Sequence, residues 1–308
     1  MNRKKEESNM KKLISLALIA VLALCCAALP AMAESHPLIY KVTDADGHYI
    51  YLLGTMHVAT AETFPIAPLD EIMGQVDRVI FEVGEADMEA IGSGAAGGQE
   101  AAISEQMFVQ DSGLSDAGAQ MISEFMTEVM NNPVEPETLK VMPLPMLAQL
   151  VQMQIMTALG YDVSGHGVDL YVFSEAKKHG LEISGVETMA DQAKAVEAEA
   201  ANLSADPAAV EQKIAEMIGN MEKLGSEMET LVKAYNTGDK DTLYRIFSAE
   251  AARSSVDGAR NARFAQAAQQ ALNDGGRALI AIGSYHIIAD DGLVNALTQA
   301  GCTVTPVK

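Results

Sequence analysis

The sequence has few cysteines, no tryptophan and few basic residues. Its three cysteines are Cys25, Cys26 and Cys302, and the first two lie in an apolar N-terminal stretch. If this stretch is removed, a single thiol remains, which excludes an internal disulfide framework. Acidic residues outnumber basic ones by 42 to 21, and the formal net charge is −21. This charge argues against nucleic acid and against anionic membranes as partners.

The first 33 residues have the parts of a secretory signal peptide. A charged leader is followed by the apolar run LISLALIAVLALCCAALP and by AMA, which ends at Ala33 like a signal-peptidase site. A retained membrane anchor is the alternative, because the run approaches the roughly 18 residues of a spanning helix. We predict a signal peptide over residues 1–33 and one mature domain over residues 34–308. The mature protein is expected in the periplasm, outside the cell or at its surface, without a stable membrane anchor.

Strand patterns lie toward both ends of the mature chain, and helical patterns fill most of the middle. Strands are expected near residues 38–42, 49–53, 78–83, 181–187, 277–283 and 302–307. Helical patterns cover about residues 104–178 and 189–247, and they return at 259–276. We therefore predict an α/β (α+β) fold. Its central mixed sheet is built from N- and C-terminal segments, with a large helical block inserted between them.

Two of the strand-like runs end in the same pattern, a glycine followed three residues later by a histidine. YIYLLG leads to His57 and ALIAIG leads to His286, while the run VIFEVG contains Glu82. Functional groups gather where strands leave an open α/β sheet, and two imidazoles with one carboxylate form a familiar divalent-metal set. The ordinary alternative is that each histidine is a surface or core residue and that Glu82 pairs with Arg78.

His166 and Asp169 lie close together in the segment YDVSGHGVDLYV. This segment has the pattern of a helix start, which is the preferred interpretation of His166. Asp169 is a candidate to orient a metal-binding histidine from behind, because such histidines commonly donate their second ring proton to a carboxylate.

Several segments resemble, in order, those of the TraB/GumN family. They are LLGTMHVA followed by FP, DRVIFEVG, GVDLYVFSEAKKHGLEISGVETMADQ, YNTGD, ARNARFAQ and ALIAIGSYHIIADDGLVNALTQAGCTV. That family includes pheromone-shutdown proteins and is related to the Tiki proteins. The resemblance implies an α/β fold around a metal-dependent, peptidase-like centre, with manganese or cobalt in preference to zinc. It carries the centre over to His57, Glu82 and His286, and it places Arg260 and Asn261 on a helix directed at the site.

The sequence thus predicts an exported metal-dependent hydrolase that acts on a peptide or protein substrate. His57 and His286 would hold the ion, while Glu82 would either bind it or act as general base. Arg260 would stabilise the developing oxyanion. One alternative is a module that captures a peptide or pheromone without cleaving it, and another is an esterase-type hydrolase. A homo-oligomer is also among the expectations.

Overall fold

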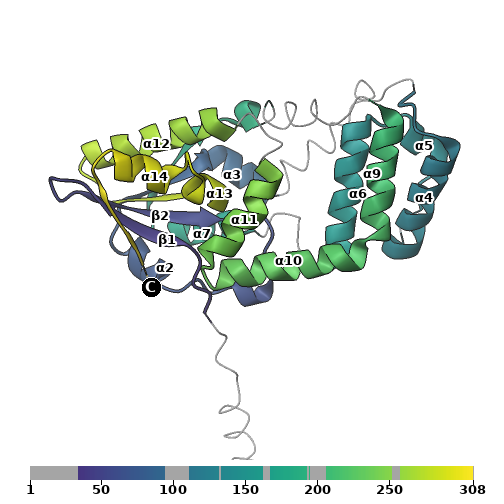
Figure 1. Ribbon diagram of the computed structural model, residues 1–308. Helices are drawn as coiled ribbons and strands as arrows, with labels where there is room; N and C mark the ends of the chain where they lie inside the picture. Colours follow the sequence, from purple (N-terminus) through teal and green to yellow (C-terminus); the bar gives the residue numbers. More distant parts are fainter. Residues whose placement is uncertain are drawn as a thin grey trace, which may run out of the picture. The chain divides into compact units, whose positions relative to one another are not determined.

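The computed structural model describes residues 34–93, 111–131, 133–161, 167–192, 194, 206–251 and 257–307 (Figure 1). The predicted signal peptide and His166 lie outside these residues, so both stay predictions. Among the helices that are described, none is both long and apolar enough to cross a membrane.

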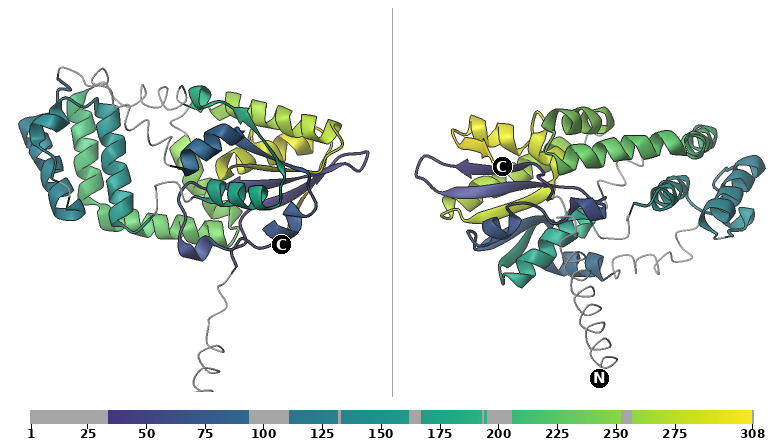
Figure 2. Two further views of the ribbon diagram at one scale, coloured as in Figure 1. Left: turned by 180° about the vertical axis from the view of Figure 1, so that it is seen from behind. Right: turned by 90° about the horizontal axis from the view of Figure 1, so that it is seen from below.

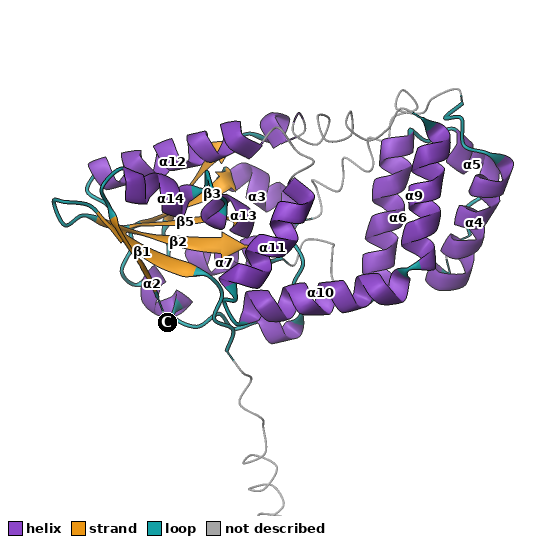
Figure 3. Cartoon of the chain, viewed as in Figure 1, coloured by secondary structure: helices purple, strands orange, loops and turns teal. Residues whose placement is uncertain are grey.

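A six-stranded mixed sheet organises the fold, with the strand order β4-β3-β5-β2-β1-β6 (Figure 3). The strands are β1 (Ile39–Thr43), β2 (Tyr49–Thr55), β3 (Arg78–Val83), β4 (Glu182–Glu187), β5 (Ala278–Gly283) and β6 (Thr303–Pro306). β2, β5, β3 and β4 are parallel, whereas β1 pairs antiparallel with both β2 and β6. The predicted α/β class and mixed sheet are therefore confirmed.

The parallel strands are continuous apolar runs because helices cover both of their faces. In β5, every residue from Ala278 to Ile282 is fully buried, as expected for a central parallel strand. Helices α2 (Leu69–Met73) and α7 (Val168–Lys178) lie on one face, and α12 (Asp257–Asn273) and α14 (Leu293–Gln299) lie on the other (Figure 2). This arrangement leaves the strand ends as the places where polar groups can reach solvent.

The sheet and its surrounding helices share one hydrophobic core. Besides the helices already named, the elements around the sheet are η1 (Ala61–Thr63), α3 (Glu85–Gly92), α11 (Lys240–Ala251) and α13 (Ser284–Ile288). The buried residues of this core include Phe81, Val172, Phe264 and Leu297.

A second hydrophobic core belongs to the inserted helices. These helices are α4 (Asp116–Met130), α5 (Pro136–Lys140), α6 (Leu144–Ala158) and α9 (Pro207–Gly219). Ile122, Leu147 and Ile214 are fully buried in this core, and Met142 and Met146 of the methionine-rich stretch pack within or against it. The last long helix of the insertion is α10 (Met221–Asn236), which contributes Val232 and Tyr235 to the core of the sheet.

Candidate functional site

The three predicted ligand residues come from neighbouring parallel strands. Glu82 is the penultimate residue of β3, while His57 follows β2 and His286 lies in α13 directly after β5. Since β5 lies between β3 and β2, and all three run parallel, their carboxyl ends share one edge of the sheet. The two strands that end in the glycine-histidine pattern, β2 and β5, are thus neighbours in the sheet.

A close backbone approach brings His57 to the start of α7. The Val168 amide donates to the Met56 carbonyl over 2.9 Å. A Cβ atom on Gly167 would lie 2.7 Å from the His57 carbonyl oxygen, so only glycine allows this contact without displacement. Asp169, in the first turn of α7, is thereby carried to the imidazole.

His57 and Asp169 form an ion pair, with 3.0 Å between Nδ1 and Oδ2. The Asp169 carboxylate raises the pKa of His57 to about 9. Burial works to raise the pKa of Asp169, but the charge and hydrogen bond of His57 outweigh it and lower that pKa. The His57 side chain is 81% exposed, so solvent screens the pair and weakens its contribution to stability.

The contact with Asp169 also decides which nitrogen of His57 is available. Nδ1 donates its proton to the carboxylate, and no described residue forms a hydrogen bond with Nε2. A neutral His57 would therefore present a free lone pair on Nε2, as metal-binding histidines backed by a carboxylate do. Asp169 thus contacts one of the two predicted histidines, while its role behind a metal ligand stays a prediction.

Glu82 is held from three directions. Its Oε1 accepts a hydrogen bond from the Gly283 amide over 2.8 Å, which ties the ends of β3 and β5 together. Its Oε2 accepts from Arg260 Nη2 over 2.9 Å and from the Gln192 side-chain amide over 3.1 Å. The carboxylate is therefore fixed in place at the strand ends.

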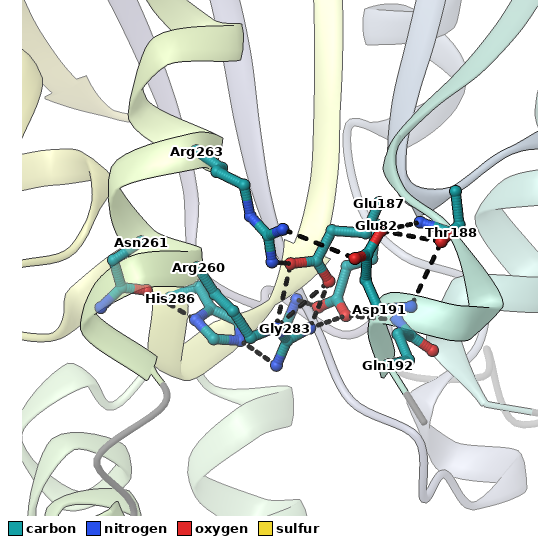
Figure 4. A network of polar contacts seen from close by, with 10 residues as sticks. All are labelled: Glu82, Glu187, Thr188, Asp191, Gln192, Arg260, Asn261, Arg263, Gly283 and His286. Atoms are coloured by element: carbon teal, nitrogen blue, oxygen red, sulfur yellow. Dashed lines mark hydrogen bonds and ion pairs between the residues drawn. The ribbon is translucent and has the colours of Figure 1, made fainter. Parts of the chain in front are cut away.

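His286 is buried, and both of its ring nitrogens are engaged (Figure 4). Nδ1 lies 2.6 Å from the Asn261 side-chain oxygen, and the Asn261 amide donates to Asp291 over 2.7 Å. Because an amide oxygen only accepts, Nδ1 carries the proton and Nε2 holds the lone pair. Arg260 Nη1 donates to this Nε2 over 3.1 Å.

Arg260 therefore connects Glu82 to His286, and it also contacts Glu187, which sequence reasoning missed (Figure 4). Burial alone would lower the pKa of Arg260, but the two carboxylates raise it above its ordinary value. Glu187 ends β4 as Glu82 nearly ends β3, so the strand-end signal was present in the sequence. The sequence does not show that β4 pairs with β3. This pairing is what brings both carboxylates to the guanidinium of Arg260.

A cavity of about 230 Å³ lies beside this network and is shared by His57 and Glu82. Asp169 and Gln192 complete its polar lining. Its apolar wall comes from Phe81, Val83, Met88, Ile91 and Leu170. His57 and Glu82 thus line the same cavity. His286 is connected to Glu82 by Arg260, which contacts both side chains.

The donor atoms fit a divalent ion at His57 and Glu82 in kind, because one offers a free imidazole nitrogen and the other a carboxylate. His286 differs, since its lone pair faces Arg260. Within the described part of the chain, Asp44, Asp46 and His48 are the one group of three potential ligands whose donor atoms lie within 4.8 Å of one another. They lie at an exposed hairpin turn and hold themselves together by hydrogen bonds.

Comparison with known proteins gives a match to one family model. The family model described as TraB/PrgY/gumN matches residues 38–306, which include every residue of the network. No curated protein and no solved structure gives a significant match. Because the matched region spans nearly the whole chain, this protein belongs to the TraB/PrgY/gumN family.

Proposed function

We propose that this protein is a metal-dependent hydrolase that cleaves a peptide bond at the cavity shared by His57 and Glu82. The observation that carries the proposal is the orientation of His57, whose Nδ1 is bound by Asp169 while Nε2 has no partner among the described residues. The substrate would be a peptide or protein outside the cytoplasm, because residues 1–33 have the pattern of a signal peptide.

His57 and Glu82 are the residues that would hold the ion, and manganese or cobalt is proposed in preference to zinc. When bound, such an ion would polarise the scissile carbonyl and lower the pKa of a water molecule. Asp169 keeps the Nδ1 proton of His57 in place. His286 would join the other two ligands only by exchanging its contact with Arg260 for the ion.

Arg260 and the cavity wall have separate roles in this proposal. The guanidinium brings a fixed positive charge to the edge of Glu82, where it would stabilise negative charge that develops on a substrate oxygen. The apolar wall formed by Met88, Ile91 and Leu170 would exclude water from the reacting bond. Gln192 donates to the same oxygen of Glu82 as Arg260 and helps to hold the carboxylate in place.

Metal content measured by plasma mass spectrometry tests the proposed ligands. After incubation with manganese or cobalt and extensive buffer exchange, the protein should retain about one ion that His57→Ala and Glu82→Gln both lose. His179→Ala is the matched control, because His179 also pairs with a carboxylate, Asp70, over 3.2 Å but lies away from the cavity lining. His48→Ala measures how much metal is bound by the hairpin group of Asp44, Asp46 and His48. Equal metal in the parent and in His57→Ala would refute the proposed centre.

A metal-free esterase is the second candidate, and the position of Arg260 favours it. The guanidinium already supplies a cation between Glu82 and His286, and His57 with Asp169 has the form of an acid–base pair. Ester turnover that persists in a chelator and disappears in His57→Ala would support this candidate over the metal-dependent one.

A further inference from the structure

Glu187 is a buried charged residue that the proposed reaction does not use directly. It is the last residue of β4, and its side chain is 0% exposed. A carboxylate at such a position is unfavourable unless it is paired and hydrogen-bonded. Glu187 meets this condition with two arginines of α12, Arg260 and Arg263.

The local sequence explains why Glu187 lies beside Glu82. β4 pairs in parallel with β3, with Glu187 opposite Val83, the residue after Glu82. The strands approach closely at Gly185, where a Cβ atom would come within 2.3 Å of the Val83 carbonyl carbon. Any other residue would force β4 away from the end of β3. The segment ending in Gly185, Val186 and Glu187 thus delivers a second carboxylate to the same guanidinium.

Glu187 and Glu82 both accept from Nη2 of Arg260, but only Glu187 also accepts from Nε (Figure 4). Glu187 accepts from Nε, with Oε1 at 3.2 Å and Oε2 at 3.1 Å, and also from Nη2 over 2.9 Å. Glu82 accepts from Nη2 alone, and His286 contacts Nη1 alone. Two contacts along the Nε edge fix the plane of a guanidinium, whereas single contacts leave it free to turn.

We propose that Glu187 is the positioning residue of this site, because it fixes the plane of Arg260 so that Nη1 and Nη2 face His286 and Glu82. The expected effect of Glu187 on catalysis rests on the proposed function, whereas its effect on the orientation of Arg260 does not. Arg263 Nη2 donates to Oε1 of Glu187 over 2.5 Å, and its side chain is 43% exposed. It thus balances the buried charge of Glu187 from the solvent-exposed side chain of a second arginine.

The test compares Glu187→Gln with Arg263→Gln in the full chain. Glu187→Gln keeps the shape of the side chain but removes its charge, whereas Arg263→Gln changes a partner of the same carboxylate. Nitrogen NMR of the arginine Nε–H groups reports the positioning directly. In the parent and in Arg263→Gln, the Arg260 Nε–H should exchange slowly with solvent, and in Glu187→Gln it should exchange at the rate of exposed arginines.

The catalytic readout is the division of the effect between kcat and KM. Glu187→Gln should lower kcat by about 10- to 100-fold, the cost of a misplaced catalytic group, and leave KM within about twofold because Glu187 does not line the cavity. Arg263→Gln should change neither value by more than about threefold. Glu187→Asp, which keeps the charge, should recover part of kcat.

Several results would overturn the proposal. A rapidly exchanging Arg260 Nε–H in the parent protein would overturn it. This measurement needs no variant, so it still decides the matter if Glu187→Gln does not fold. Protected Nε–H and unchanged kcat in Glu187→Gln, or an equal loss of kcat in Arg263→Gln, would also contradict it. If the parent hydrolyses no peptide or ester, the proposed function fails, while the NMR comparison still decides whether Glu187 positions Arg260.

Discussion

At the scale of single residues, the site depends on pairs in which one side chain decides what another can do. Asp169 decides which ring nitrogen of His57 carries the proton, and Asn261 does the same for His286. The second choice matters because Nε2 of His286 then accepts from Arg260. Each pair can be tested by removing the group that makes the choice.

The first prediction concerns the ionisation of His57 in the metal-free protein. Asp169→Asn should lower the pKa of His57 from about 9 toward its ordinary value near 6.5, as followed by NMR titration of the ring. Because the folded-state pKa is raised, the pair stabilises the fold fully below about pH 6.5. That contribution disappears as the pH rises through about 9. Asp44→Asn, in another histidine–aspartate pair, should leave this titration unchanged.

The second prediction concerns the proton on Nδ1 of the buried His286. Asn261→Leu leaves this N–H without its acceptor, so the free energy of unfolding should fall by about 1–3 kcal/mol in denaturant titrations. Gln270→Ala is the matched control, because Gln270 lies on the same helix and its side-chain amide donates to the exposed Asp274. Equal stability of the two variants would show that the Asn261 contact contributes nothing.

At the scale of elements, the end of each central strand depends on close contact with the next element. Gly54 in β2 faces α13, and a Cβ atom there would lie 2.7 Å from Ser284 Oγ and 3.1 Å from Ser284 Cα. Since α13 carries His286, the spacing between β2 and α13 also controls the position of the site.

Gly54→Ala should therefore destabilise the protein by about 1–3 kcal/mol through overpacking. Gly74→Ala is the control, because Gly74 has φ −71° and the nearest atom to a Cβ there lies at 3.5 Å. We expect that variant to be neutral or slightly stabilising. Thermal unfolding of both variants checks the difference, and equal melting temperatures would contradict the packing argument.

The strands and their pairing also explain which parts of the site could be predicted from the sequence. Apolar runs ending at Gly54 and Gly283 were enough to predict strands and to place His57 and His286 at their ends. Glu82 followed from the same pattern. Glu187 was missed because its importance depends on the pairing of β4 with β3, and pairing between distant segments leaves no local pattern. For the same reason, the sequence could not show that Arg260 lies between Glu82 and His286.

At the scale of the whole molecule, the described residues form two hydrophobic cores, and of these the first contains the strands that carry the site. Leu147 is fully buried in the core of the inserted helices. Leu147→Ala should cost that core about 2–5 kcal/mol, with hydrogen exchange of α6 accelerated. The His57 titration should stay unchanged, because Leu147 belongs to the core of the inserted helices whereas His57 follows β2 of the sheet. A shifted His57 pKa in this variant would show that the two cores are coupled.

We propose that peptide bonds are hydrolysed with a metal ion in the cavity of His57 and Glu82. The most direct test of this proposal is mass spectrometry of a defined peptide mixture after incubation with the manganese- or cobalt-loaded protein. We predict cleavage by the parent and by His179→Ala, loss of cleavage in His57→Ala and Glu82→Gln, and loss of parental activity in a chelator with recovery on adding metal. Intact peptides with the loaded parent, or equal cleavage by His57→Ala, would contradict metal-dependent hydrolysis at this cavity.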